Sequence, residues 1–125
     1  MKLVVTSTGA NLDSPIDPRF GRAQHLLLVE TDGMTFEAID NPSVQASGGA
    51  GVQTAQIVAT MGASAVLTGN VGPNAYYALS AAGLKVHVGA AGTVRQAIEA
   101  YLRGELQETT EPSVGSHSGM GQASR

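Results

Sequence analysis

The sequence contains no cysteine, and only 4% of its 125 residues are aromatic. Without cysteine there can be no disulfide, no thiolate zinc site, no cysteine nucleophile and no iron–sulfur cluster ligated by cysteine. Charged residues are few, at 14%, and a net charge of −3 leaves no basic patch that would favour nucleic acid. No apolar run is long enough for a signal peptide or a membrane span, so we expect a cytoplasmic protein that binds neither membranes nor nucleic acid.

The sequence is instead rich in small residues, including 16 glycines, and 42% of it is hydrophobic. This length and composition suit a single domain with one sizeable core. Core residues become scarce near the end, where Glu, Thr, Ser and Gly predominate. We therefore predict one ligand-binding α/β domain over residues 1–107 and a mobile tail over residues 108–125.

Short apolar runs of strand type alternate with helical patterns along the predicted domain. Leu3-Val4-Val5 and Ala65-Val66-Leu67 are continuous apolar runs, as expected for strands buried on both faces. Asp32-Gly33 lies between two further strand patterns and predicts a tight antiparallel hairpin. The expected strands are residues 3–5, 26–30, 35–40, 65–67 and 84–88, and the expected helices are residues 52–61, 73–82 and 94–102.

Two of the predicted helices begin with clear signals. Pro73 suits the first helical position, because its φ is already helical and its missing N–H is one that the first turn leaves unpaired. Thr93 and Gln96 have the capping-box spacing at the start of the last helix. A glycine follows each of the three helices, at positions 62, 83 and 104, as is common where helices end.

The order of these elements predicts the fold class. Strand–helix–strand units force parallel pairing with right-handed crossovers, whereas the hairpin adds antiparallel strands. The simplest solution is a three-layer α/β fold with a mixed five-stranded sheet and helices on both faces. If the first and fourth strands are central neighbours, the loops at residues 6–24 and 69–73 meet beyond their carboxyl ends, where α/β sheets bind ligands.

Glycine loops around this meeting point suggest an anion-binding site. Backbone N–H groups at helix N-termini, flanked by glycines that allow close approach, bind anions well. Arg19 and Arg22 could add charge-assisted hydrogen bonds. Ordinary turns explain the glycines of any one loop, so the prediction depends on several loops together. The candidate ligand-binding residues are Thr8, Arg19, Phe20, Gly21, Arg22, Gly48, Gly49, Gly51, Gly69, Asn70, Gly72, Asn74, Gly89, Gly92 and Thr93.

Other patterns leave weaker alternatives. Asp13 and Asp17 leave open a metal-dependent nuclease or hydrolase, although they do not have the spacing of a metal site. His25 and His87 fit packed or surface positions better than ligand positions, and His117 stands alone in the predicted tail. The sequence also lacks a Walker-type Gly-Lys-Ser/Thr motif and the glycine spacing of a dinucleotide-binding fold. We therefore predict neither a catalytic residue nor a metal ligand.

Five motifs occur together in the predicted domain. They are Asp17-Pro18-Arg19-Phe20-Gly21-Arg22-Ala23, Asp40-Asn41-Pro42, Gly49-Ala50-Gly51, Leu67-Thr68-Gly69-Asn70-Val71-Gly72-Pro73-Asn74-Ala75 and Val88-Gly89-Ala90-Ala91-Gly92-Thr93-Val94. In combination they resemble the dinitrogenase iron–molybdenum cofactor biosynthesis family, over roughly residues 1–110. The resemblance implies a ribonuclease H-like fold and a non-catalytic carrier of the iron–molybdenum cofactor or its iron–sulfur precursors, with cofactor-assembly proteins as partners.

The sequence departs from the nitrogenase-dedicated members of that family at one position. Those members carry a histidine just before Phe-Gly, whereas this chain has Arg19. A guanidinium group stays protonated and has no free lone pair for a metal. An anionic cluster could still be held by Arg19, Arg22 and the loop N–H groups. The alternative function is a binding module for another small anion, such as a phosphate-bearing metabolite.

Overall fold

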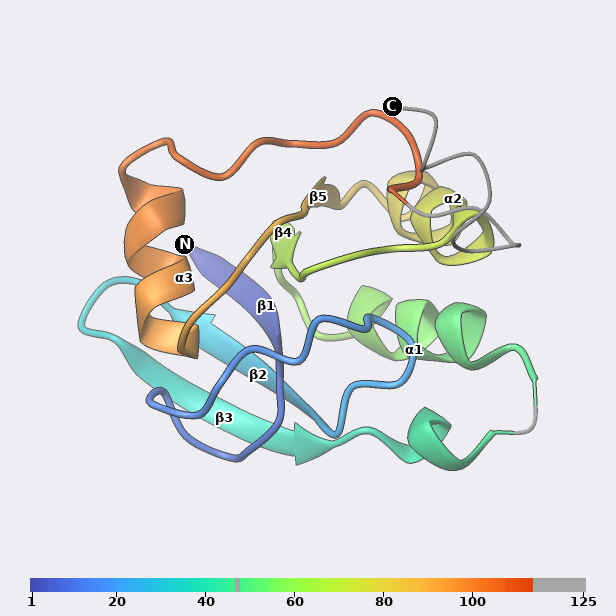
Figure 1. Ribbon diagram of the computed structural model, residues 1–125, viewed down its shortest axis with the longest axis horizontal. Coiled ribbons are helices and arrows are strands. Elements are labelled where there is room, and N and C mark those ends of the chain that lie inside the picture. Colours follow the sequence, from blue (N-terminus) through green and yellow to red (C-terminus); the bar gives the residue numbers. More distant parts are fainter. Residues whose placement is uncertain (47, 114–125) are drawn as a thin grey trace.

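A five-stranded sheet with the strand order β3-β2-β1-β4-β5 forms the middle layer of the protein (Figure 1). The computed structural model describes residues 1–46 and 48–113. The strands are β1 (Lys2–Ser7), β2 (His25–Glu30), β3 (Thr35–Asp40), β4 (Ala65–Leu67) and β5 (Lys85–His87); the helices are α1 (Ala50–Ala59), α2 (Pro73–Ala81) and α3 (Val94–Leu102), with a 3-10 turn η1 (Pro42–Gln45).

Strand pairing confirms the predicted mixed sheet. β1 pairs with β2 in antiparallel fashion and with β4 in parallel fashion, so the first and fourth strands are central neighbours. β2 and β3 form the predicted antiparallel hairpin, and β4 and β5 are parallel. The positive φ values of the hairpin turn lie at Gly33 and Met34, one residue later than Asp32-Gly33 predicts.

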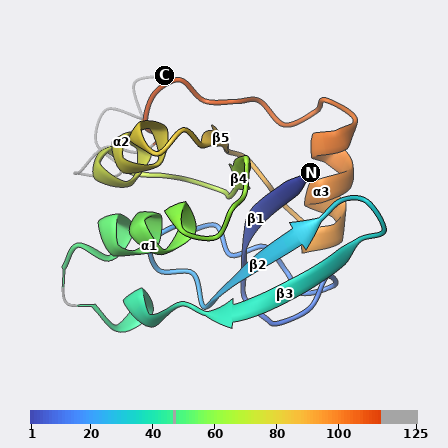
Figure 2. The same ribbon diagram turned by 180° about the vertical axis from the view of Figure 1, so that it is seen from behind.

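Helices cover both faces of the sheet, as predicted, with α3 on one face and α1 and α2 on the other (Figures 1 and 2). Successive side chains of a strand point to opposite faces. Val5 therefore packs in the cluster with Ile98 of α3, whereas Val4 packs in the cluster with Val58 of α1 and Leu79 of α2. None of these five side chains is exposed to solvent, which explains the continuous apolar run in β1.

Helix α1 begins at Ala50, two residues before the predicted start, and ends at Ala59. The early start follows from Gly49, which caps the helix in the left-handed conformation with φ at 70°. Helix α2 begins at Pro73, as predicted, and ends at Ala81. In the part of the chain that the structure describes, no helix combines the length and apolar character needed to cross a bilayer.

The predicted capping box of α3 is present. The Thr93 hydroxyl accepts a hydrogen bond from the Gln96 backbone N–H at 3.1 Å, and the Gln96 side chain accepts one from the Thr93 N–H at 2.9 Å. Thr93→Ala should therefore lower the free energy of unfolding by about 1 kcal/mol, because the Gln96 N–H loses its side-chain acceptor. Thr93→Ser keeps the hydroxyl and should match the wild type in urea unfolding; equal stability of the alanine and serine variants would contradict this role.

Residues 108–113, here called the C-terminal strap, are hydrogen bonded to the domain. Glu108 bridges to His87, and the Thr109 N–H donates to the Val86 carbonyl at 2.8 Å. Ser113 donates its N–H to the Val71 carbonyl at 3.0 Å and accepts from the Val71 N–H at 2.8 Å. The strap thus follows the β5 edge beyond residue 107, where the sequence predicts the tail to begin. The remainder of that predicted tail, including His117, lies outside the described residues.

Candidate functional site

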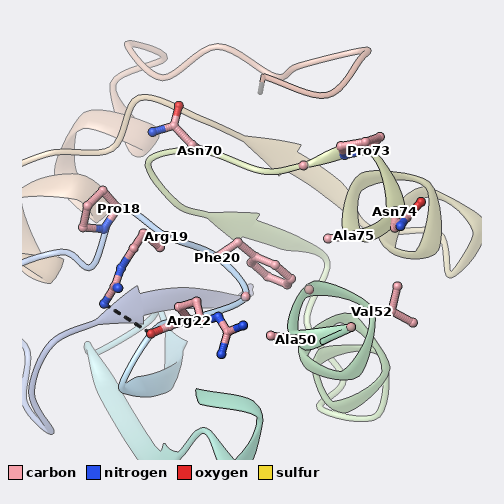
Figure 3. Close-up of a pocket in the computed structure, with 14 residues that line it drawn as sticks. Pro18, Arg19, Phe20, Arg22, Ala50, Val52, Asn70, Pro73, Asn74 and Ala75 are labelled. Atoms are coloured by element: carbon pink, nitrogen blue, oxygen red, sulfur yellow. Dashed lines mark hydrogen bonds between the residues drawn. The ribbon is translucent and has the colours of Figure 1, made fainter. Parts of the chain in front are cut away.

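A pocket of about 470 Å³ lies beyond the C-terminal end of β4, between the N-termini of α1 and α2 (Figure 3). Three segments remote in sequence line it: residues 18–22, 49–52 and 70–75. Nine lining residues belong to the predicted set: Arg19, Phe20, Gly21, Arg22, Gly49, Gly51, Asn70, Gly72 and Asn74. Five others were not predicted: Pro18, Ala50, Val52, Pro73 and Ala75.

Two loops meet at the pocket because their backbones pair. The Asn70 N–H donates to the Pro18 carbonyl at 2.8 Å, and the Phe20 N–H donates to the Asn70 carbonyl at 3.3 Å. Gly69 allows this approach, since a Cβ there would lie only 2.7 Å from the Pro18 Cα. Gly69 therefore supports the pocket without lining it. The Phe20 ring is 2% exposed and packs in the core beneath the site.

The N-termini of α1 and α2 converge on the pocket without side-chain caps. Gly49 and Gly72 are their N-cap residues, and neither helix has a side-chain hydrogen bond at its cap. The N–H groups of a first helical turn have no intrahelical acceptor, and the helix dipole makes that end positive. Gly51 keeps the two helix ends close, because a Cβ there would lie 3.2 Å from the Ala75 Cβ. Two positive helix ends thus face one pocket, an arrangement that suits an anion.

The third helix N-terminus is occupied by the protein's own chain. The Val94 N–H donates to the Ser14 carbonyl at 2.9 Å, and the Arg95 N–H donates to the Leu12 carbonyl at 2.8 Å. The segment around residues 12–16 therefore lies where an anion would bind α3. Six of the predicted site residues do not line the pocket: Thr8, Gly48, Gly69, Gly89, Gly92 and Thr93.

The two candidate arginines differ in how they are held. Arg22 donates from Nη1 to the Ala46 carbonyl at 2.6 Å and to the Val44 carbonyl at 3.2 Å. These bonds tie the η1 region to residues 17–24, here called the pocket loop. The Arg19 side chain is 62% exposed, and its contacts are long: 3.4 Å to Asp17 Oδ1 and 3.5 Å to the Arg22 carbonyl (Figure 3). Among the described residues that line the pocket, Arg19 is therefore the cation that is free to turn toward a ligand.

Asp17 shapes the pocket loop from beneath. Its side chain is buried, and its two carboxylate oxygens accept hydrogen bonds from the Arg19 and Gln24 N–H groups, both at 3.2 Å. Its backbone is tied to Thr6, which accepts the Asp17 N–H at 3.0 Å and donates its hydroxyl to the Asp17 carbonyl at 2.7 Å. The sequence pattern around Asp17 gave no indication of this positioning role.

Asn41 and Thr54 fix the other end of the same loop. Asn41 Nδ2 donates to the Ala23 carbonyl at 2.9 Å, and the Thr54 hydroxyl donates to the Gly21 carbonyl at 3.1 Å. Both side chains are buried. The sequence analysis noted Asn41 only as part of the Asp40-Asn41-Pro42 motif, and it gave no signal for Thr54.

The carboxylates considered for metal chemistry are engaged elsewhere. Asp13 lies on the surface with Arg95, whose Nε is 3.0 Å from Asp13 Oδ1, and this hydrogen bond lowers the pKa of Asp13. Neither Asp13 nor Asp17 lines the pocket. Within residues 1–46 and 48–113, no group of three or more His, Cys, Asp or Glu side chains is arranged to hold a metal ion.

Comparisons with known proteins place the chain among its relatives. A family model described as dinitrogenase iron-molybdenum cofactor matches residues 1–104. The apo form of the orange protein from Desulfovibrio gigas is 43% identical, with a TM-score of 0.86 over 90% of this chain and 95% of that chain. A NifB-like protein from Thermotoga is 33% identical, with a TM-score of 0.75 over 86% and 91% of the two chains. An uncharacterised protein from Methanocaldococcus jannaschii is 28% identical over 96 residues, which are 74% of this chain and 81% of that protein.

Proposed function

This chain belongs to the dinitrogenase iron-molybdenum cofactor family, and from that premise we propose that it is a non-catalytic carrier of an anionic metal–sulfur cofactor precursor. The family and its relatives indicate a role in cofactor biosynthesis or transport. The cargo would be an iron–molybdenum or iron–sulfur cluster, exchanged with cofactor-assembly proteins. The observation that carries the proposal is the convergence of two uncapped helix N-termini and Arg19 on one pocket.

The chemistry of the pocket lining indicates how such a cargo would be held. Among residues 1–46 and 48–113, no residue that lines the pocket is a cysteine, histidine, methionine, aspartate or glutamate. Arginine cannot coordinate a metal, because its guanidinium has no free lone pair. We therefore propose that the cluster enters with its own ligands complete. Helix N–H groups, Arg19 and the side-chain amides of Asn70 and Asn74 would hold its outer sulfur or oxygen atoms through hydrogen bonds and charge.

Tetrathiomolybdate, a molybdenum dianion enclosed by sulfide, is a suitable probe of this proposal. After anaerobic mixing and gel filtration, its visible absorption should elute with the protein. A matched sample with molybdate, which has the same charge and no sulfide, separates charge recognition from sulfide recognition. Complete separation of tetrathiomolybdate from the protein would contradict the carrier proposal.

Arg19→Ala should weaken tetrathiomolybdate binding by about tenfold or more. A hydrogen bond to a charged group contributes about 1.5–3 kcal/mol, and each 1.4 kcal/mol is a factor of ten in affinity. A spectrophotometric titration measures this change. Arg103→Ala is the matched control, because Arg103 pairs with Glu105 at 3.0 Å and does not line the pocket. Equal losses in the two variants, or none in Arg19→Ala, would remove Arg19 from the site.

A phosphate-bearing metabolite is the alternative ligand. The observation that favours it is Arg19, because a guanidinium binds phosphate through charge-assisted hydrogen bonds but has no lone pair with which to coordinate a metal. Thermal stabilisation by phosphate compounds that is lost in Arg19→Ala, together with no retention of tetrathiomolybdate, would support this alternative. We do not expect magnesium- or manganese-dependent hydrolysis, because Asp13 and Asp17 are held by other partners outside the pocket.

A further inference from the structure

We propose that the outer edge of β3 is a docking surface for an extended, basic segment of a partner protein. β3 pairs with β2 through six consecutive residue pairs, from His25–Asp40 to Glu30–Thr35, without a bulge. Within the described residues no strand pairs with its other edge. β3 lies on the outer side of the sheet in both views (Figures 1 and 2). An unprotected edge of this kind offers backbone hydrogen bonds to an added strand.

The register identifies which backbone groups face outward. The Asn41 N–H donates to the Gln24 carbonyl at 3.0 Å, which places a hydrogen-bonded pair at the end of the β2–β3 ladder. Because such pairs alternate in antiparallel sheets, residues 35, 37 and 39 direct their N–H and carbonyl groups toward β2. The N–H and carbonyl groups of Phe36, Ala38 and Asp40 therefore point away from the sheet and form the template for a sixth strand.

The two edges of the sheet differ in whether another segment of the chain covers them. The β5 edge is covered by the C-terminal strap, through the Glu108–His87 bridge and the Thr109 hydrogen bond to Val86. The β3 edge has no such cover in residues 1–46 and 48–113, and β3 contains neither proline nor lysine, which commonly block edge pairing. Phe36 and Ile39 remain 40% and 38% exposed, on opposite faces of the strand. An added strand would cover both.

Charge and shape define the partner. Residues 25–40 contain four acidic residues and neither lysine nor arginine, and the Asp40 side chain is 92% exposed. A basic segment complements this charge. A hollow of about 220 Å³ extends from β3 across β2 to Lys2 of β1. It is lined by Lys2, Leu28, Glu30, Thr35, Phe36 and Glu37, and its part beside Leu28 and Phe36 could receive an apolar side chain of the added strand. The occupant is therefore an extended segment in which basic and apolar residues alternate.

This surface is separate from the ligand pocket, since no residue of β3 lines that pocket. A partner docked on β3 would leave the pocket entrance accessible. The proposal concerns partner binding only and does not depend on which anion the pocket holds, so the failure of one proposal leaves the other standing.

The test is a titration of the full-length, ¹⁵N-labelled protein with the synthetic peptide acetyl-(Lys-Val)₄-amide. We expect chemical-shift changes centred on β3, and at least tenfold slower hydrogen exchange of the Phe36, Ala38 and Asp40 amides. The matched peptide acetyl-(Glu-Val)₄-amide should bind at least tenfold more weakly. Equal binding of the two peptides, or shifts that spread over the surface without β3, would overturn the proposal.

Two further variants test backbone pairing directly. A Lys-Val peptide methylated on two adjacent central nitrogens cannot form a continuous ladder and should lose at least tenfold in affinity on the unaltered protein. Ala38→Pro removes an outward N–H while sparing the β2 ladder and should cause a similar loss; a proline at an edge is tolerated in this orientation. Unchanged affinity of the methylated peptide would exclude strand addition. Concentration-dependent shifts of the β3 amides without peptide would assign the edge to a second copy instead.

Discussion

Asp17→Ala should lower the free energy of unfolding by about 3 kcal/mol, because a buried hydrogen-bonded donor left without its acceptor costs about 1–3 kcal/mol. The substitution leaves two such donors without their acceptor, namely the N–H groups of Arg19 and Gln24. It also removes the carboxylate that lies beside the Arg19 side chain. Urea unfolding followed by far-UV circular dichroism measures the change. The pocket loop would lose the contacts that define its curvature, so ligand binding should fall as well.

Asp13→Ala is the matched control for this prediction. Asp13 lies in the same long loop, but its carboxylate is exposed and pairs with Arg95 at 3.0 Å. Ion pairs of this kind contribute little to stability. The unfolding midpoint of Asp13→Ala should therefore stay close to that of the wild type. Similar midpoints for Asp17→Ala and the wild type would show that Asp17 has no organising role.

Gly21→Ala should lower the free energy of unfolding by about 1–3 kcal/mol, the usual cost of overpacking, and should weaken ligand binding at least tenfold. A Cβ at Gly21 would lie 2.7 Å from the Gly51 backbone nitrogen and 2.8 Å from the Gly51 Cα. These atoms belong to the first turn of α1 and cannot move aside as a flexible side chain does. The helix end would shift away from the pocket loop, and its N–H groups would leave their present position. Differential scanning calorimetry and the tetrathiomolybdate titration measure the two effects.

Gly48→Ala provides the comparison, since the same methyl group is added on the same side of the protein. Among the described residues, no atom lies within 4 Å of the position that its Cβ would occupy, and its φ is not in the left-handed region. Stability and binding should both remain at the wild-type level. If Gly21→Ala behaved like Gly48→Ala, close approach of the pocket loop to α1 could not be what positions the site.

Local signals in the sequence predicted most of the fold. Thr93 and Gln96 predicted the start of α3, and the apolar runs of β1 and β4 predicted strands buried on both faces. The sequence placed the loops at residues 6–24 and 69–73 together only on the condition that these two strands are central neighbours, which the structure shows them to be. Such signals succeed because they depend on neighbours within a few residues, or on periodic burial.

The parts of the site that sequence reasoning missed depend on contacts distant in the chain. A glycine loop before a helix predicts an open N-terminus, yet at α3 the carbonyl groups of Leu12 and Ser14 already fill that position. Leu12 and Ile16 are buried against α3, which the irregular composition of their loop concealed. Ser113 likewise reaches Val71 across 42 residues, a contact that composition does not indicate. Helix and strand propensities carry no information about contacts between residues that are distant in the chain.

The position of β1 also bears on how the chain folds during synthesis. β1 is synthesised before the other strands, and the β1–β2–β3 part of the sheet can form as soon as β3 has emerged. The parallel partners of Leu3 and Val5, which are Ala65 and Leu67 of β4, are synthesised only later. Until β4 has emerged, one edge of β1 has unpaired backbone N–H and carbonyl groups, and its apolar side chains lack their later neighbours in β4. Exposed strand edges pair readily with other chains. The interval between translation of β3 and of β4 is thus the stage at which the edge of β1 is most open to pairing with another chain.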